Sequence, residues 1–140
     1  MSRHIYSLLC SKLSIDQKTN TISIFEVLER LEFTLGGTKV IPEGVPFTAT
    51  FLSMWARSDQ LTPEKHKQRL RLLSPNGKDL GTFEMEVDLT EFPRARTFAE
   101  VHGLKLDGQG WYEWQLEAQQ ELGQWIEVAR FPLEVAVRLE

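Results

Sequence analysis

The sequence predicts an all-β fold, an antiparallel sandwich of two sheets with about eight strands, in a single domain that spans residues 1–140. Apolar side chains take every second position of several short segments, which is the period of a strand with one buried face and one wet face. Turn-forming residues separate these segments at intervals of roughly ten residues. A hydrophobic content of 41% and a charged content of 26% are ordinary for a folded chain, so a core of this size needs no disulfide.

The clearest alternation follows Leu104 and Leu106, after a glycine-containing corner. Its inward positions are Tyr112, Trp114, Leu116 and Ala118, and its outward positions are Trp111, Glu113, Gln115 and Glu117. A tyrosine just past such a corner is typical of immunoglobulin-like sandwiches, where the phenol bonds to backbone a few residues upstream. Antibody domains place a disulfide-forming cysteine two residues later. Here Trp114 holds that position, and we expect its ring to fill the gap between the sheets.

The first two segments differ in how clearly they can be interpreted. Ile5–Cys10 is an apolar run that leads into the turn-rich stretch Ser14–Asn20, which predicts a hairpin-like first pair. Thr21–Leu35 fits two structures. A helix would use a capping-box pair and apolar residues at helical spacing, namely Ser23, Glu26, Ile24, Val27, Leu28 and Leu31. The β-branched and aromatic start of the segment favours one long bent strand instead, with a bulge near Phe25.

Glycines and prolines then mark an irregular connection. They are Gly36, Gly37, Pro42, Gly44 and Pro46. Phe47–Arg57 alternates again, and because Leu52 and Met54 fall on its second face we expect a strand that is central or partly covered on both faces. The next connection is predicted to contain one short helical turn near Thr62, where the sequence Thr-Pro-Glu fits the start of a helix.

The clearest hairpin is Gln68–Leu89, in which two alternating strands flank the turn sequence SPNGK. The opposed wet-face rows of this hairpin are Arg69 and Arg71 on one strand and Glu84 and Glu86 on the other. Exposed ion pairs between such rows contribute about 0 to 1 kcal/mol each. Arg94–Val101 is predicted to be another strand, and Gln124–Phe131 an edge strand that Pro132 kinks before the last core residues.

Charge and cysteine content exclude several classes of partner. The formal net charge of -4 argues against a nucleic-acid partner, whose binding depends on Lys and Arg that neutralise phosphates. Cys10 is the single cysteine, so no disulfide can form within the chain, and we interpret it as a small buried apolar residue. No stretch has the roughly 20 apolar residues of a membrane span, so no membrane partner is expected. These features together predict a cytoplasmic protein.

Several pieces of the chain also resemble a known group of proteins. The pieces are the opening LLCSKLSIDQKTNTISIFEVLE, with Cys10, Asp16, Thr19, Asn20 and Ser23, the SPNGK hairpin, GWYEW and the closing FPLEV. In these pieces the chain is similar to small uncharacterised bacterial and phage proteins that are predicted to be immunoglobulin-like sandwiches. The resemblance implies a fold and a bacterial or phage origin. It implies no activity and no catalytic residues.

We find no constellation of residues typical of an enzyme. The sequence lacks G-x-S-x-G, H-E-x-x-H, C-x-x-C and the phosphate-binding G-x-x-x-x-G-K-[ST]. His4, His66 and His102 are isolated in sequence and show no metal-ligand spacing. We therefore predict no catalytic residues, no metal site and no cofactor, and a small-molecule ligand is not expected.

Two surface features stand out as a possible interaction surface. The run that contains Lys65, Lys67 and Arg69 is the one basic cluster, which fits either a solvated strand face or a contact with an acidic partner. Trp111 faces outward if Tyr112 faces inward, and exposed aromatic residues are favoured at binding surfaces. A loop or a second copy of the chain is the alternative cover for Trp111.

These observations favour a non-enzymatic protein-interaction or structural module of a bacterial cytoplasmic assembly. Such a module would present a sheet edge or a loop end to a protein partner or to another copy of itself. The alternative is a glycan-binding module, in which Trp111 stacks on a sugar beside polar residues such as Glu113 or Gln115. An enzyme is the third hypothesis, and it requires His102, a carboxylate and Cys10 to meet in one pocket.

Overall fold

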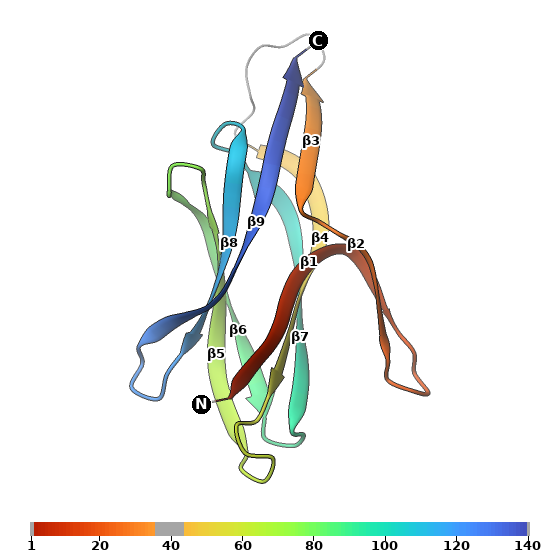
Figure 1. The fold of residues 1–140 in the computed structure, drawn as a ribbon, viewed down its shortest axis with the longest axis vertical. Helices are drawn as coiled ribbons and strands as arrows, with labels where there is room; N and C mark the ends of the chain where they lie inside the picture. The colour runs from red at the N-terminus through yellow and green to blue at the C-terminus, as the bar shows by residue number, and fades with distance from the viewer. Residues whose placement is uncertain (1, 36–43, 140) are drawn as a thin grey trace.

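The computed structural model describes residues 2–35 and 44–139, and these residues form nine strands in two layers (Figure 1). The strands are β1 (Arg3–Ile15), β2 (Ile22–Val27), β3 (Arg30–Leu35), β4 (Gly44–Ala56), β5 (Glu64–Leu73), β6 (Asp79–Leu89), β7 (Arg94–Lys105), β8 (Gly110–Gln119) and β9 (Trp125–Leu139). The four-stranded sheet has the order β2-β1-β4-β7, and the five-stranded sheet has the order β3-β9-β8-β5-β6. The predicted all-β fold with two sheets is confirmed.

The core lies between the two layers and follows the predicted alternation. Tyr112, Leu116 and Ala118 on β8 are fully buried, and Trp114 is 2% exposed. Leu52 lies on the face of β4 that points away from the core, and it is also fully buried. This agrees with the central position that the apolar residues on both faces of the strand predicted. β4 pairs with β1 on one side and with β7 on the other.

The segment Thr21–Leu35 is neither a helix nor one strand, because it divides between the two sheets. Glu26 has a positive φ of 54°, which bends the chain next to the predicted bulge at Phe25. Leu28 N then donates a hydrogen bond to Leu9 O of the first layer at 2.7 Å, and Glu134 N of the second layer donates to Glu29 O at 2.9 Å. This crossing turns the predicted long strand into β2 and β3, and it raises the strand number above the predicted eight.

The pairing of β3 with β9 corrects the prediction of a wholly antiparallel fold, because these two strands run parallel. Ion pairs reinforce the pairing: Arg30 contacts Glu134 at 3.4 Å, and Glu32 contacts both Arg30 and Arg138. The parallel register begins opposite Glu134, so the part of β9 before it forms a sheet edge. Pro132 falls in this part of β9, which pairs with β8 but not with β3, and an edge strand tolerates a residue without an N–H.

Tyr112 forms the predicted corner at the start of β8. Its hydroxyl donates to Gly108 O at 2.5 Å and accepts a hydrogen bond from Asp107 N at 2.6 Å. Gly108 has a φ of 78°, a conformation that favours glycine. The phenol thus ties the strand to the turn before it.

The connection between β4 and β5 contains no helical turn. Thr62 N donates to Asp59 O at 3.2 Å, which closes a single turn, and β5 begins directly afterwards at Glu64. The residues that the structure describes contain no helix, and so none that could cross a membrane. Gly44 and Pro46 of the predicted irregular connection belong to β4, which is irregular between Val45 and Thr48. The rest of that connection, with Gly36, Gly37 and Pro42, lies outside the described residues.

The turn sequence SPNGK closes the predicted hairpin between β5 and β6. Gly77 N donates to Ser74 O at 2.9 Å, and Ser74 N donates to Lys78 O at 2.8 Å. Gly77 has a φ of 81°, which a side chain would strain. The hairpin is therefore formed as the sequence predicts.

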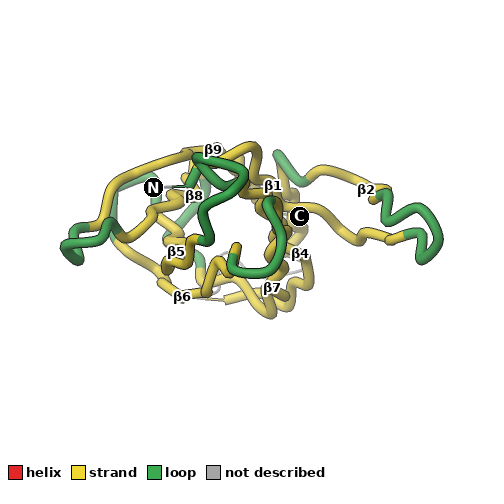
Figure 2. Tube along the Cα trace, turned by 90° about the horizontal axis from the view of Figure 1, so that it is seen from below, coloured by secondary structure: helices red, strands yellow, loops and turns green. Residues whose placement is uncertain are grey.

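The second half of β1 and all of β2 form a two-stranded arm, residues 11–27, that leaves the body of the sandwich (Figures 1 and 2). The view from below shows the arm extending from the four-stranded sheet, away from the five-stranded one (Figure 2). The hydrophobic cluster of the core includes no side chain of this arm among the described residues. Because a two-stranded hairpin alone is only marginally stable in water, the arm needs further contacts to hold its shape.

Candidate functional site

The four residues of the predicted interaction surface all lie on the outward face of the five-stranded sheet, but they are not one site. Trp111 is 61% exposed, in agreement with the alternation of β8. Arg69 lies opposite Glu117 in the register, six residues from Trp111 along β8, which is about 20 Å in an extended strand. Lys65 and Lys67 lie further along β5 at the other end of the sheet. The basic cluster and the tryptophan are therefore separate features.

The basic cluster is largely neutralised by its neighbours. Lys65 Nζ lies 3.3 Å from Glu86 Oε1, and Arg69 Nε donates to Glu117 Oε1 at 2.8 Å. The Arg69 guanidinium also stacks over the ring of Trp125 at 4.3 Å from its centroid. Arg69 does lie opposite Glu84 in the register, as the predicted hairpin requires, but its ion pair goes to β8 instead. An acidic partner would have to displace these contacts.

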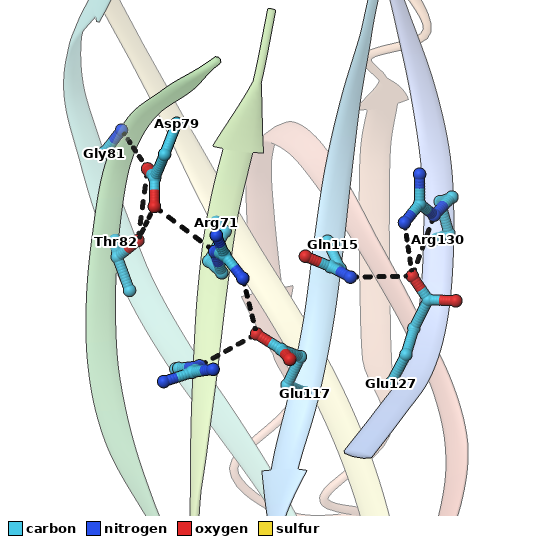
Figure 3. Close-up of polar contacts among 9 residues, drawn as sticks. Arg71, Asp79, Gly81, Thr82, Gln115, Glu117, Glu127 and Arg130 are labelled. Carbon is cyan, nitrogen blue, oxygen red and sulfur yellow. Dashed lines mark hydrogen bonds and ion pairs between the residues drawn. The ribbon is translucent and has the colours of Figure 1, made fainter. Parts of the chain in front are cut away.

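Paired charges cover the rest of this face (Figure 3). Glu117, on β8, also accepts from Arg71 at 3.3 Å, and Glu127 accepts from Gln115 at 2.9 Å and from Arg130 at 2.8 Å. The hydrogen bond from Arg69 is the largest cause of the lowered pKa of Glu117, with further contributions from Arg71, while partial burial opposes them. Most charged side chains on the outer surface of the five-stranded sheet are therefore paired with one another.

The outer face of the four-stranded sheet is different in character, because apolar side chains line up across it. We call this set the apolar face: Tyr6 and Leu8 of β1, Val27 of β2, Leu52 and Met54 of β4, and Phe98 of β7. Leu8, Leu52 and Phe98 form one row of register partners, and Tyr6 and Met54 lie in the next. Phe98 is 42% exposed and Val27 is 49% exposed, whereas Leu52 between them is fully buried. Exposed apolar side chains grouped in this way are typical of an interaction surface.

A groove of about 790 Å³ separates the arm from this apolar face. Ile15 and Ile22 line it from the arm, and Met54, Phe92 and Phe98 line it from the sheet and the turn before β7. Across it Arg96 Nη2 donates to Asn20 O at 2.7 Å, a hydrogen bond that holds the arm tip over the sheet. The wall thus combines apolar side chains with Arg94, Arg96 and the polar residues of the arm tip, so it suits a partner segment that brings both apolar and polar groups.

Sequence reasoning missed this face, although one signal for it was present. The apolar residues on the second face of β4 predicted a strand that is central or partly covered on both faces. The cover is partial, since Leu52 is buried while Phe98 next to it stays exposed. A strand with apolar residues on both faces is therefore a signal of an interaction surface as well as of a central position.

The residues of the enzyme hypothesis do not form a catalytic arrangement. Cys10 is fully buried, and burial raises the pKa of its thiol, which keeps it protonated. In the register Thr50 separates Cys10 on β1 from Glu100 on β7, so that thiol and carboxylate lie two strands apart, about 10 Å. His102 contacts Glu100 at 2.9 Å at the exposed surface. Within residues 2–35 and 44–139, no three His, Cys, Asp or Glu side chains are placed to hold a metal ion.

The other two histidines flank a buried tryptophan and are packing residues. The ring centroids of His4 and His66 lie 5.2 Å and 4.6 Å from that of Trp55. Burial lowers the pKa of both histidines, which favours the neutral rings. His66 Nδ1 also lies 3.0 Å from the hydroxyl of Ser2. This arrangement anchors the start of β1 against β5.

A buried polar cluster joins the two layers beside these histidines. Gln68 of β5 is fully buried, and its Oε1 accepts from Trp55 Nε1 at 3.0 Å and from the hydroxyl of Ser53 at 3.1 Å. Gln68 Nε2 donates to the hydroxyl of Thr97 at 2.5 Å. Because the amide is satisfied on both sides, this cluster is a structural link and offers no free group for chemistry.

No family model matches this chain, and no curated protein matches it. Among solved structures, it is similar to the crystal structure of the PmoD soluble domain from Methylocystis sp. ATCC 49242 (Rockwell), with a TM-score of 0.40 and 11% sequence identity. The match covers 97% of this chain and 97% of that chain.

Proposed function

We propose that this chain is a non-enzymatic interaction module that binds protein through the apolar face of its four-stranded sheet and the groove under its arm. The observation that carries the proposal is the exposure of the apolar side chains on this face, where Phe98 beside Leu52 and Val27 beside Cys10 remain 42% and 49% exposed. Burying apolar surface of this kind stabilises a complex by about 25 cal/mol per Å². The charges of the opposite sheet are already paired with one another, so that sheet has less to gain from a partner.

The same proposal assigns the sandwich to the immunoglobulin-like class. The tyrosine corner at Tyr112 supports this assignment, as does a strand order in which β3 at the start of the chain pairs parallel with β9 at its end. Trp114 stands where antibody domains carry a cysteine, and its ring fills the interior instead. The lone buried cysteine fits a reducing compartment, which supports a place in a bacterial cytoplasmic assembly.

A second copy of the chain is the partner that the arm favours. The arm presents Leu13, Ile15, Ile22 and Ile24 from one of its faces, and these residues pair with each other across its two strands. Among the described strands β2 lies at an edge of its sheet, so its outer backbone groups can pair with a further strand. A second copy can therefore pair with this edge and bury the exposed apolar face beside it, and contacts made in both directions give a reciprocal, twofold interface.

The test measures the molar mass of the protein in solution by light scattering coupled to size-exclusion chromatography, over a range of concentrations. We expect a dimer for the wild type. Phe98→Glu places a charge in the middle of the apolar face and should give a monomer that is still folded. Leu122→Glu is the matched control, since this residue is also a large exposed apolar residue, at 91%, but lies in the turn between β8 and β9, away from the apolar face.

Three results have distinct meanings. A dimer that Leu122→Glu breaks and Phe98→Glu leaves intact would refute the assigned face. A monomer at every concentration would exclude the second copy, and cross-linked pull-downs from the source organism with wild type, Phe98→Glu and Leu122→Glu would then test for a different protein. Capture that is equal for all three proteins would refute binding through the apolar face.

A glycan-binding module is the second candidate, and the position of Trp111 favours it. Trp111 lines a hollow of about 630 Å³ together with Pro132, Arg30 and Glu134, which combines an exposed ring with polar groups. The residues proposed to assist it, Glu113 and Gln115, are instead bound to Arg130 and Glu127. Screening on a glycan array with wild type and Trp111→Ala tests this candidate. An absence of hits, or hits that survive the substitution, would exclude it.

A further inference from the structure

β7 forms one edge of the four-stranded sheet and is open to a further strand. Among the described strands it pairs with β4 alone, and residues 94–102 of β7 follow residues 48–56 of β4 in an antiparallel register without a break. The backbone N–H and C=O groups on the other side of β7 therefore have no strand partner in the described part of the chain. A regular strand in an edge position can accept the backbone of another chain.

This edge lacks the features that keep sheet edges single. Such edges are usually protected by proline, lysine, a bulge or an inward-pointing charge. Residues 94–102 contain no proline and no lysine, and their pairing with β4 has no bulge. The side chains that they direct into the sandwich are uncharged, namely Ala95, Thr97, Ala99 and Val101. By contrast, the free part of β9 contains Pro132, and the β6 edge carries a row of carboxylates that would repel its own copy.

The outward side chains of β7 are complementary to themselves. In chain order they are Arg94, Arg96, Phe98, Glu100 and His102. An antiparallel copy of β7 that is centred on Phe98 places Arg96 opposite Glu100 of the second copy, and the same contact is repeated in the other direction. Phe98 then lies on the twofold axis, opposite its own copy. Opposite charges and aromatic side chains that face each other across two strands stabilise a sheet.

These side chains are available for such contacts. Phe98 is 42% exposed, and the side chain of Glu100 is 72% exposed. Within the described residues Arg96 forms no ion pair, and its guanidinium donates to the backbone and the side chain of Asn20. The arginines on the five-stranded sheet, in contrast, contact carboxylates of their own chain. Arg96 is thus a cation without an acidic partner, and it lies beside an open edge.

We propose that the β7 edges of two copies pair antiparallel about a twofold axis at Phe98, with Arg96 of each copy opposite Glu100 of the other. The two four-stranded sheets then form one continuous sheet, and the row of Leu8, Leu52 and Phe98 continues into the same row of the second copy. A twofold contact of this kind closes on itself and gives a dimer. The inference goes beyond the proposed function, because it uses the edge of the sheet opposite to β2.

The first experiment tests the position of the axis by cross-linking the full chain, with copper phenanthroline as the oxidant. Phe98→Cys places two thiols on the axis, where the Cα atoms of opposite residues are about 4.5 to 5.5 Å apart and a disulfide can form. We expect a covalent dimer on a non-reducing gel. His102→Cys is the matched control, because its side chain is also exposed, at 66%, but lies roughly 27 Å from its own copy in this register. The native Cys10 is fully buried in both variants.

The second experiment exchanges the two charges and measures the dissociation constant of the dimer by analytical ultracentrifugation. Arg96→Glu and Glu100→Arg each place like charges opposite one another, and each should weaken the dimer about tenfold or more. The double variant restores opposite charges and should regain the affinity of the wild type within about threefold. The proposal is overturned if the wild type is monomeric at every concentration, if His102→Cys cross-links as fast as Phe98→Cys, or if the double variant dimerises as weakly as the single variants.

Discussion

Replacing Tyr112 with phenylalanine removes a single oxygen atom from the corner of β8. That oxygen donates to Gly108 O at 2.5 Å and accepts from Asp107 N at 2.6 Å, so the substitution breaks two hydrogen bonds and leaves the ring in place. Tyr112 is fully buried, and water therefore cannot take the place of the lost hydroxyl without opening the corner. The two backbone groups lose their partners while the apolar packing of the strand is unchanged.

The expected cost follows from these two contacts. A neutral hydrogen bond contributes about 1 kcal/mol net, and a partner left unsatisfied in a buried site costs about 1 to 3 kcal/mol. Asp107 and Gly108 are only half-buried, so part of this cost is recovered by hydration. We expect Tyr112→Phe to lower the free energy of unfolding by about 2 to 3 kcal/mol, which lowers the melting temperature by roughly 6 to 12 °C for a chain of this size.

The assay is equilibrium unfolding in urea, followed by tryptophan fluorescence, with Tyr6→Phe as the control. The chain has two tyrosines, and Tyr6 lies half-buried on the outer face of β1. If the two substitutions cost the same within about 0.5 kcal/mol, the uncertainty of such a comparison, the corner does not pin the strand and the reasoning fails.

The same hydroxyl predicts a dependence on pH. Burial, and to a smaller extent the charge of Asp107, raises the pKa of Tyr112, although the hydrogen bond from Asp107 N opposes the shift. A group whose pKa is raised on folding stabilises the protein below its unfolded value, near pH 10, and loses this contribution as the pH rises further. The difference in stability between wild type and Tyr112→Phe should therefore be constant to about pH 9 and shrink above pH 10.

Three further substitutions test other parts of the structure. Trp114→Ala should cost about 3 to 5 kcal/mol, the range for a buried aromatic truncation, and an unchanged melting temperature would contradict its place in the core. Glu117→Gln should destabilise the protein at pH 7 by about 1 to 3 kcal/mol. Because the hydrogen bonds from Arg69 and Arg71 lower the pKa of Glu117, this difference should be full above the unfolded pKa and shrink as the pH falls from there through the lowered folded pKa, and a difference that does not change with pH would argue against the ion pairs. For His66, whose pKa burial lowers, stability should fall as the pH drops from 7 to 5, and the fall should be smaller in His66→Phe than in the wild type.

Local sequence patterns were enough to predict which side chains of a single strand are buried and where a tight turn forms. The alternation of β8 predicted the buried positions, including Tyr112 and Trp114, and the SPNGK turn predicted the hairpin that joins β5 and β6. These features depend on neighbours one or two residues apart, or on the direct partner across a tight turn. The short-range signal is therefore enough to define them.

The predictions that were wrong concern features that depend on contacts between distant parts of the chain. The arginine at position 69 was expected to pair within its hairpin, but it contacts Glu117, which is 48 residues away. The change of sheet after β2 depends on a left-handed conformation at Glu26, a residue type that gives no signal for such a bend. The helical turn near Thr62 was predicted from the capping preference of a few residues. That preference is weak compared with the pairing of β5 to a neighbouring strand on each of its sides.

The candidate site was the least predictable part. An apolar face becomes visible only when Leu8, Leu52 and Phe98, which come from three strands, are aligned by register. Each residue alone is an ordinary member of an alternating strand. The arm that overhangs this face results from a bend within one continuous strand, and no proline or glycine marks that bend in residues 8–15.

The parallel pairing of β3 with β9 has a consequence for how the chain folds. It joins residues such as Arg30 and Glu134, which are about a hundred positions apart, so the hundred residues between them must leave the ribosome before β3 finds its neighbour. Until then β3 is an unpaired strand that can join the wrong chain. Pairings that span such long loops are slow to form, and we expect completion of this edge to be a late step in folding.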